Sequence, residues 1–149
     1  MKSVIAIQGF KNIGKTLTIK LVRELLLDKY PNAEEIELIK NTIDIRVIVI
    51  INEFKIGIES QGDPGGRLSD SLKYFLKENC DIIVCPTRTY GKTVEVVEAL
   101  ENQGYEITWI PKEANKDNYE KFNKKLAEQI FKKIQDLYSI WNYRGTYNG

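Results

Sequence analysis

Two glycines, a lysine and a threonine near the N-terminus have the types and the spacing of a polyphosphate site. Residues 9–16 read Gly-Phe-Lys-Asn-Ile-Gly-Lys-Thr and fit G-x-x-x-x-G-K-[ST] at every fixed position. Gly9 and Gly14 let the backbone turn back on itself, so that successive N–H groups point at phosphate oxygens. Lys15 can then reach the β- and γ-phosphates as a point charge, and the Thr16 hydroxyl can ligate Mg²⁺. The pattern therefore predicts a phosphate site with a bound magnesium ion.

The segments around this motif are those that such a site requires. The apolar run Val4-Ile5-Ala6-Ile7 predicts a strand before it, and leucines at helical spacing predict a helix behind it that reaches Asp28. The start of that helix adds its positive end to the attraction for the anion. The alternative, a strand–helix turn with a chance lysine, is disfavoured because the match extends over residues 9–16. The residues expected to hold the nucleotide are Gly9, Asn12, Ile13, Gly14, Lys15, Thr16 and Leu17.

On these residues the chain resembles the P-loop NTPases. The resemblance implies binding of ATP or GTP with Mg²⁺, and it gives Lys15 and Thr16 their roles at the phosphates and the metal. It also implies a second acidic group for the magnesium shell, at the end of an apolar strand. Strand 54–58 ends in Glu59, which has the better position, and Asp63 further along has the more usual side chain. A loop carboxylate satisfied by solvent or by a backbone N–H is the alternative for each.

Two arginines lie on loops that we expect to flank the nucleotide. Ligands of parallel sheets sit beyond the carboxyl ends of the strands, which nominates loops 59–67, 86–91 and 111–118. Arg67 and Arg88 lie on two of these loops, where arginine suits the charge on a transferring phosphoryl group, although plain surface positions are the alternative. The glycine density of loop 59–67 also predicts a segment that changes between nucleotide states. The predicted catalytic residues are Lys15, Glu59, Arg67 and Arg88, and the predicted metal ligands are Thr16, Glu59 and Asp63.

Strands and helices alternate along the chain, which predicts an α/β fold with a mostly parallel sheet. Asn52-Glu53 is a two-residue connection typical of a hairpin, which adds one antiparallel strand. Run 34–40 is open between a strand and a helical turn, and we take it as a strand. With the motif, this order predicts the three-layer P-loop NTPase fold in one domain, residues 1–149, with an aromatic tail at 140–149. The predicted strands are 3–8, 34–40, 44–51, 54–59, 81–85 and 105–110, and the predicted helices are 15–30, 68–76, 92–102 and 117–138.

The order of segments resembles two groups of P-loop proteins in part. As in small GTPases, a hairpin leads to an acidic strand end, here Glu59-Ser60-Gln61-Gly62 in place of Asp-x-x-Gly, and Thr42 matches the threonine that senses the γ-phosphate. As in MinD/ParA-like ATPases, an acidic strand end and a proline-glycine loop lead over residues 57–86 to a strand that opens with aspartate, although Lys11 falls one place off their signature lysine. Asn115-Lys116-Asp117 lacks the spacing of the guanine-recognition motif. ATP is therefore favoured over GTP.

Composition and charge disfavour several other classes. A formal net charge of +1 gives no electrostatic footprint for nucleic acid or an acidic membrane, and no apolar run reaches the length of a membrane span. Two cysteines without any histidine disfavour a zinc site, and the missing histidine leaves proton transfer to carboxylates, lysine or water. The first strand leaves no room for a signal peptide, so we expect a cytoplasmic protein with reduced thiols. A protein partner or a homo-oligomer stays open.

The leading functional hypothesis is a small P-loop NTPase that binds ATP with Mg²⁺ and hydrolyses it, while loop 59–67 changes between states. A nucleotide or small-molecule kinase is an alternative, but the arginines are scattered along the sequence and form no lid segment. A GTPase-like regulatory module with slow turnover is the third hypothesis. It is kept open by the missing histidine and by glutamate, Glu59, at the place of the metal-binding aspartate.

Overall fold

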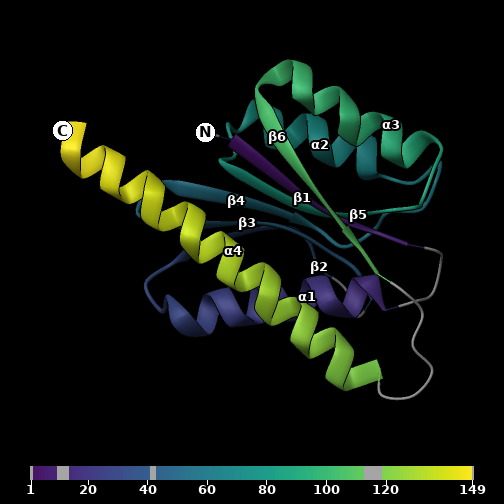
Figure 1. The fold of residues 1–149 in the computed structure, drawn as a ribbon, viewed down its shortest axis with the longest axis horizontal. Helices are drawn as coiled ribbons and strands as arrows, with labels where there is room; N and C mark the ends of the chain where they lie inside the picture. The colour runs from purple at the N-terminus through teal and green to yellow at the C-terminus, as the bar shows by residue number, and fades with distance from the viewer. Residues whose placement is uncertain (1, 10–13, 41–42, 113–118, 149) are drawn as a thin grey trace.

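The computed structural model describes residues 2–9, 14–40, 43–112 and 119–148, and every structural statement below concerns these residues. Six strands form one sheet in the order β2-β3-β4-β5-β1-β6, and helices cover it (Figure 1). The strands are β1 (Lys2–Gln8), β2 (Glu34–Lys40), β3 (Ile45–Ile51), β4 (Phe54–Glu59), β5 (Ile82–Thr87) and β6 (Tyr105–Pro111). The helices are α1 (Lys15–Lys29), α2 (Leu68–Lys77), α3 (Lys92–Glu98), the 3₁₀ helix η1 (Ala99–Gln103) and α4 (Tyr119–Asn148). The single helix predicted for 92–102 thus divides into α3 and η1.

The sheet is mixed, and β3 is the strand that runs against the others. β1 pairs in parallel with β5 and β6, and β4 pairs in parallel with β5. β3 is antiparallel to both of its neighbours, β2 and β4, so the other described strands share one direction. The predicted α/β class and the antiparallel hairpin strand are confirmed, as is the strand at 34–40. Because β1, β4, β5 and β6 point the same way, the loops that follow them gather at one edge of the sheet.

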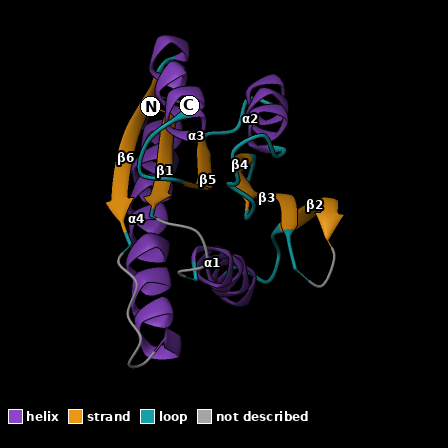
Figure 2. Ribbon diagram, turned by 90° about the vertical axis from the view of Figure 1, so that its right-hand side faces the viewer, coloured by secondary structure: helices purple, strands orange, loops and turns teal. Residues whose placement is uncertain are grey.

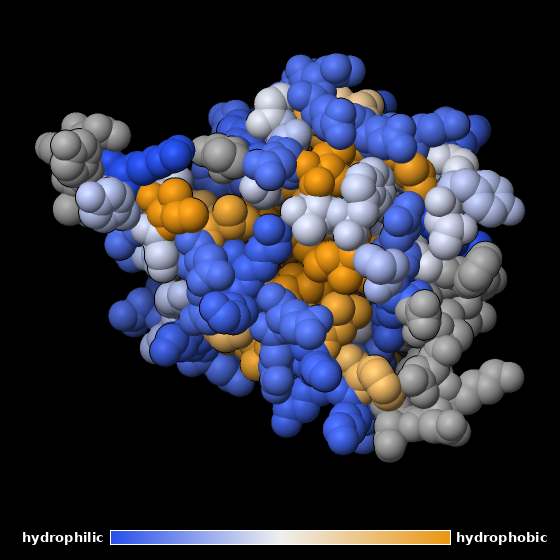
Figure 3. Space-filling model, viewed as in Figure 1, coloured by the Kyte–Doolittle hydropathy of each residue, from blue (hydrophilic) through white to orange (hydrophobic). Residues whose placement is uncertain are grey.

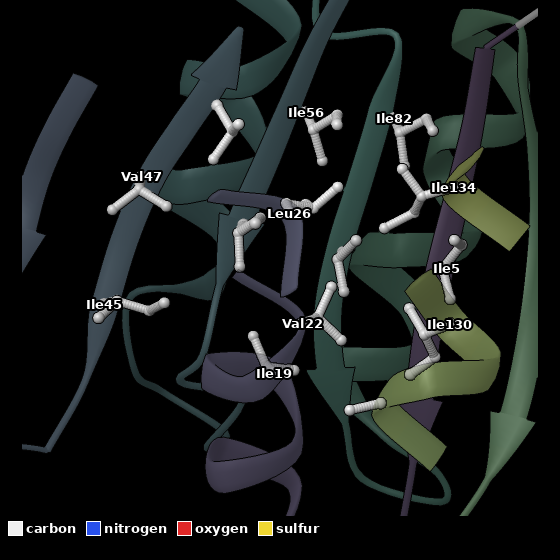
Figure 4. Close-up of a cluster of buried hydrophobic side chains, with 14 of the residues drawn as sticks. Ile5, Ile19, Val22, Leu26, Ile45, Val47, Ile56, Ile82, Ile130 and Ile134 are labelled. Carbon is white, nitrogen blue, oxygen red and sulfur yellow. The ribbon is translucent and has the colours of Figure 1, made fainter. Parts of the chain in front are cut away.

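Helices cover both faces of the sheet, so its central strands are apolar on both sides. The residues Val4 to Ile7 of β1 are fully buried, as expected for a central parallel strand. The side chains of α1 and α4 pack on one face and those of α2 and α3 on the other, and Figure 2 shows α1 and α2 on opposite sides of the sheet. Figure 4 shows the first of these cores, where Leu26 of α1 and Ile130 of α4 lie against the strands. The chain therefore has three layers.

The position of α1 is set by its apolar face. Ile19, Val22 and Leu26 recur at helical spacing and are fully buried, and burial of each such side chain contributes about 1.5–3 kcal/mol. The helix begins directly after Gly14, whose backbone is left-handed (φ 85°), a conformation that costs glycine little. The packing of α1 therefore fixes where its first residue, Lys15, lies.

The C-terminal helix is longer than predicted. The sequence pattern ended it at Tyr138 and left a separate aromatic tail, whereas α4 continues to Asn148. The ring of Trp141 lies 5.2 Å from that of Phe54 and 6.0 Å from that of Tyr138. The aromatic residues extend the helix because they continue its buried face and pack on the start of β4.

The two cysteines lie inside the protein as free thiols, Cys80 and Cys85. Burial raises the pKa of each thiol to about 12, so both are protonated and unreactive at neutral pH. Among the described helices, none joins the length to the apolar composition that crossing a membrane requires.

Candidate phosphate site

The loops that follow β1, β4, β5 and β6 meet at one edge of the sheet. The Gly9 amide donates to the Thr87 carbonyl (3.1 Å), and the Lys112 amide donates to the Gln8 carbonyl (2.7 Å). Gly62 lies so close to β5 that a Cβ in its place would stand 2.4 Å from the carbonyl oxygen of Pro86, an approach that only glycine allows. The described parts of the nominated loops therefore come together beside the start of α1.

The Lys15 side chain lies inside this edge rather than in solvent. Its ammonium group donates to the carbonyls of Gly9 and Thr87, the latter at 2.8 Å, and the residue is 9% exposed. Burial and, to a smaller extent, the nearby Arg88 guanidinium lower the Lys15 pKa to about 8, while Asp63 acts in the opposite direction. A buried cation with a second cation near it is an arrangement that a bound anion would stabilise.

Arg88 brings this second cation from the loop after β5. Its Nη2 donates to Asp63 Oδ1 at 2.9 Å, and its backbone amide donates to the Thr93 hydroxyl at 2.9 Å. Asp63 has a side chain that is 56% exposed, so the ion pair is open to solvent and contributes little to stability. The Arg88 Nε is buried and has no hydrogen-bond partner among the residues that the structure describes. Arg88 therefore retains an unsatisfied donor close to Lys15.

The residues after Lys15 continue this site along the first turn of α1. The Thr16 hydroxyl donates to the carbonyl of Ser60, just beyond β4, at 3.3 Å. This hydroxyl was predicted to ligate a metal. The contact holds it at the start of the glycine-dense loop. Leu17 is 57% exposed. Thr16 is therefore positioned between α1 and the end of β4, at the same edge of the sheet as Lys15.

Asn123 reaches this turn from α4, and the sequence reasoning did not identify it. The residue is 2% exposed, and its Oδ1 lies 3.2 Å from the Thr18 hydroxyl, which is also 2.9 Å from the Gly14 carbonyl. A Cβ at Gly14 would stand 2.8 Å from the Asn123 side-chain amide. Asn123 therefore packs directly on the glycine that begins α1, which makes it a positioning residue for the turn.

Asn123 lies on the buried face of α4. Phe122 beside it is 46% exposed, whereas Asn123, Ala127 and Ile130 are buried. Asn123 stands four positions before Ala127 and seven positions before Ile130, so the three residues share one face of the helix. This spacing is the signal that could have identified Asn123.

Lys112, in the nominated loop 111–118, is another cation that the sequence reasoning did not single out. It follows β6 directly, is 8% exposed, and burial lowers its pKa. Its backbone is anchored on Gln8 of β1, so its Cα lies at the same edge of the sheet as the phosphate motif. A lysine placed directly after a strand end was the signal for it.

Glu59, a predicted metal ligand, lies in a buried ion-pair cluster. Its side chain is fully buried, and both carboxylate oxygens accept hydrogen bonds of 2.8 Å from the Arg67 guanidinium. The Ser71 hydroxyl and the Gln61 amide (3.0 Å) donate to the same carboxylate, and Arg46 Nε lies 3.5 Å from it. The carboxylate is thus engaged by groups from β3, from the loop after β4 and from α2.

These contacts set a condition on the predicted roles of Glu59 and Arg67. A bidentate pair in a buried place is strong, and removing one partner leaves the other as an uncompensated charge. Either residue must therefore leave the pair before it can act on a metal or a phosphate. Within the described ranges, no three His, Cys, Asp or Glu side chains gather as a metal site. The roles of Glu59 and Arg67 stay predictions.

Part of the predicted site lies outside the described residues. This holds for two residues predicted to hold the nucleotide, Asn12 and Ile13, for Lys11 and Thr42, and for the segment 115–117. The structure therefore describes the two glycines, the lysine and the threonine of the motif, together with the elements on either side.

A scan against protein-family models, a search of curated proteins and a search of solved structures each found no match to this chain. Function must therefore be inferred from the motif and from the geometry around it.

Proposed function

We propose that this protein is a P-loop NTPase that binds a nucleoside triphosphate, with ATP favoured, together with Mg²⁺ at the turn between β1 and α1. The observation that carries the proposal is the buried Lys15 ammonium at the carboxyl ends of β1 and β5, on the first turn of α1. The same lysine belongs to the match to G-x-x-x-x-G-K-[ST]. A buried cation beside Arg88 is unfavourable unless an anion compensates it, and a polyphosphate would do so.

The chain's own groups would exchange partners when phosphate binds. Lys15 would exchange the carbonyl of Thr87 for charged phosphate oxygens, which accept stronger hydrogen bonds. Arg88 would exchange its solvent-open contact with Asp63 for the same anion. The first amides of α1, after the left-handed Gly14, add backbone donors and the positive helix end. Each exchange favours the bound state, because a neutral or exposed acceptor is replaced by a dianionic one.

For the metal, the contacts favour Asp63 over Glu59 as the carboxylate ligand. The exposed Asp63 would become available once Arg88 turns to the phosphates, whereas Glu59 would have to give up Arg67 and Ser71. Among the described residues, the Thr16 hydroxyl makes one long hydrogen bond, to a carbonyl, and it is easily redirected. Thr16 and Asp63 would therefore hold Mg²⁺, which supplies charge neutralisation at the phosphate oxygens.

We further propose that the bound triphosphate is hydrolysed by in-line attack of water. Lys15 and Arg88 would neutralise charge on the transferring group, which is the largest contribution in reactions of this kind. The chain contains no histidine, so the proton of the attacking water would pass to a carboxylate or to the phosphate itself.

The Glu59–Arg67 pair favours slow turnover, as in a regulatory module. Two of the predicted catalytic groups are engaged with each other inside the protein, and separating them is costly. Nucleotide binding at Lys15 does not require this separation, because the Lys15 contacts and the Glu59 contacts share no hydrogen bond. Nucleotide would therefore bind with the pair intact, and any step of hydrolysis that uses Glu59 or Arg67 would be slow until the pair separates.

A thermal-shift series tests the proposal. ATP, GTP, ADP and GDP are added with and without Mg²⁺, and the triphosphates with Mg²⁺ should raise the melting temperature most, with ATP ahead of GTP. Lys15→Ala should lose the shift while it keeps the fold. Phosphate release, measured with and without candidate acceptors, then distinguishes hydrolysis from phosphoryl transfer and from slow turnover. Equal melting temperatures with and without every nucleotide would refute the binding proposal.

A further inference from the structure

The two edge strands of the sheet differ in their protection against pairing. β2 carries charged residues, among them Glu34, Glu35 and Glu37, and its pairing with β3 has a register shift after Glu37. Charges and bulges of this kind prevent an edge strand from pairing with another chain. β6 has Glu106 as its single charged residue, and its register with β1 is continuous. β6 is therefore the unprotected edge.

Apolar side chains accompany this open edge. Ile107, Trp109 and Ile110 of β6 are half-buried, and Phe122 of the neighbouring α4 is 46% exposed. Figure 3 shows hydrophobic side chains at the centre of the face on which α4 and β6 lie in Figure 1. In Figure 2, β6 lies at the margin of the molecule, with no described element beyond it. An edge of this kind is a template for another strand.

The direction of the free backbone groups of β6 follows from its pairing with β1. The Lys112 amide donates to Gln8 of β1, so residues an even number of positions from Lys112 turn their N–H and C=O groups toward β1. The odd-numbered residues turn theirs to the open side. Tyr105, Ile107 and Trp109 there offer both a donor and an acceptor, and Pro111 offers a carbonyl.

We propose that β6 pairs antiparallel with β6 of a second copy of this chain, which joins the two sheets across a two-fold axis. The inferred register is centred on Thr108, so that the two Thr108 residues face each other as a non-hydrogen-bonded pair. Ile107 of each copy then faces Trp109 of the other as a hydrogen-bonded pair. Tyr105 faces Pro111, whose missing N–H falls at the end of the ladder. Thr–Thr and aromatic–β-branched pairs are favourable across strands.

The charges of β6 are compatible with a second copy as the occupant. In this register Glu106 faces Ile110 of the other copy, so the two Glu106 carboxylates lie at opposite ends of the paired strands. The pairing thus sets no like charges of β6 against each other.

Cysteine crosslinking tests the register. The Cα atoms of a non-hydrogen-bonded antiparallel pair lie about 4.5 Å apart, which a disulfide can span. Thr108→Cys should therefore form a disulfide-linked dimer under mild oxidation. The matched control is Glu106→Cys, whose two thiols would be about 13 Å out of register and should not crosslink. The unmodified chain gives the background, because Cys80 and Cys85 are buried.

The mass in solution tests the pairing without added cysteine. Sedimentation equilibrium should give twice the chain mass of 17.2 kDa. Ile107→Lys should weaken dimerisation at least tenfold, because the two added charges would become diagonal neighbours across the new ladder. Ile36→Lys makes the same change on the other edge and should leave the dimer intact. Circular dichroism verifies that both variants are folded.

Three results would overturn the proposal. The first is a folded unmodified chain that stays monomeric up to about 0.1 mM. The second is a folded Ile107→Lys variant that dimerises as tightly as the unmodified chain. The third is a dimer in which Thr108→Cys crosslinks no better than Glu106→Cys.

Discussion

The Lys15 site (Lys15, Arg88 and Asp63) and the Glu59 cluster (Glu59 with Arg67 and its neighbours) lie at the same edge of the sheet but balance their charges differently. In the Lys15 site, two cations lie near each other, and the carboxylate that faces them is more than half exposed. In the Glu59 cluster, a fully buried carboxylate receives hydrogen bonds from several groups at once. The two cations of the first are thus balanced only by an exposed carboxylate, whereas the carboxylate of the second is balanced inside the protein.

This difference separates binding from turnover. A bound anion would stabilise a site of the first kind, because its groups can change partners at little cost. A completed buried pair opposes rearrangement, because either partner alone would be an uncompensated charge. We therefore expect substitutions in the Lys15 site to change nucleotide affinity and substitutions in the Glu59 cluster to change stability.

The largest expected effect is on stability, from Glu59→Gln. The variant leaves the Arg67 guanidinium without its counter-charge, and we expect the free energy of unfolding to fall by about 3–5 kcal/mol. Urea denaturation measures this loss. The matched control is Asp63→Asn, which breaks an exposed pair and should cost at most about 1 kcal/mol. Similar losses for the two variants would contradict the comparison.

The next effect is on affinity, from Lys15→Ala. We expect ATP to bind at least about 100-fold more weakly, because hydrogen bonds to charged groups contribute about 1.5–3 kcal/mol each and Lys15 would make more than one. The folded protein should lose no stability comparable to that of Glu59→Gln. Equilibrium titration with a fluorescent ATP analogue measures the affinity, and Lys20→Ala, which removes a lysine of the same helix that donates to the Ile43 carbonyl, serves as the control.

The third effect follows from the lowered pKa of Lys15. In the free protein this pKa is about 8, so the ammonium is lost above pH 8 unless an anion holds it. Nucleotide affinity should therefore fall about tenfold between pH 9 and pH 10. Stability without nucleotide should change in the opposite direction. Between pH 8 and pH 10.5 the unfolded chain binds more protons at Lys15 than the folded one, so this residue makes stability rise with pH. Lys15→Ala should remove the pH dependence of both affinity and stability. If both quantities change with pH in that variant as they do in the unmodified protein, another group is responsible.

The smallest effect concerns the metal, through Asp63→Asn. The substitution removes a ligand that we assign to Mg²⁺, so affinity for ATP with Mg²⁺ should fall about fivefold. It also releases Arg88, so affinity for ATP in EDTA should stay equal or rise. Asp70→Asn on α2 is the control. A loss of equal size with and without Mg²⁺ would exclude Asp63 as a metal ligand.

The local part of the fold and the site was predictable from the sequence. Strand β1, the left-handed Gly14 and the start of α1 each follow from signals within a few residues, namely an apolar run, a glycine and a helical period. The same holds for β3 and β4, because the two-residue connection at Asn52-Glu53 fixes their hairpin. These elements form much as the pattern indicates.

The long-range part was not predictable, since it depends on which distant residues meet. No residue near Glu59 in the sequence indicates that Arg46 and Ser71 reach its carboxylate. Asn123 meets Gly14 only because α1 and α4 pack on the same face of the sheet. The end of α4 was misplaced for the same reason, since the contact of Trp141 with the start of β4 cannot be read from a local period.

Calorimetric titration of ATP with Mg²⁺ into the folded protein at pH 7 measures directly whether nucleotide binds at Lys15. We expect saturable one-to-one binding that inorganic triphosphate displaces and that is lost in Lys15→Ala. A folded protein that binds neither ATP, GTP nor inorganic triphosphate at millimolar concentration would contradict it.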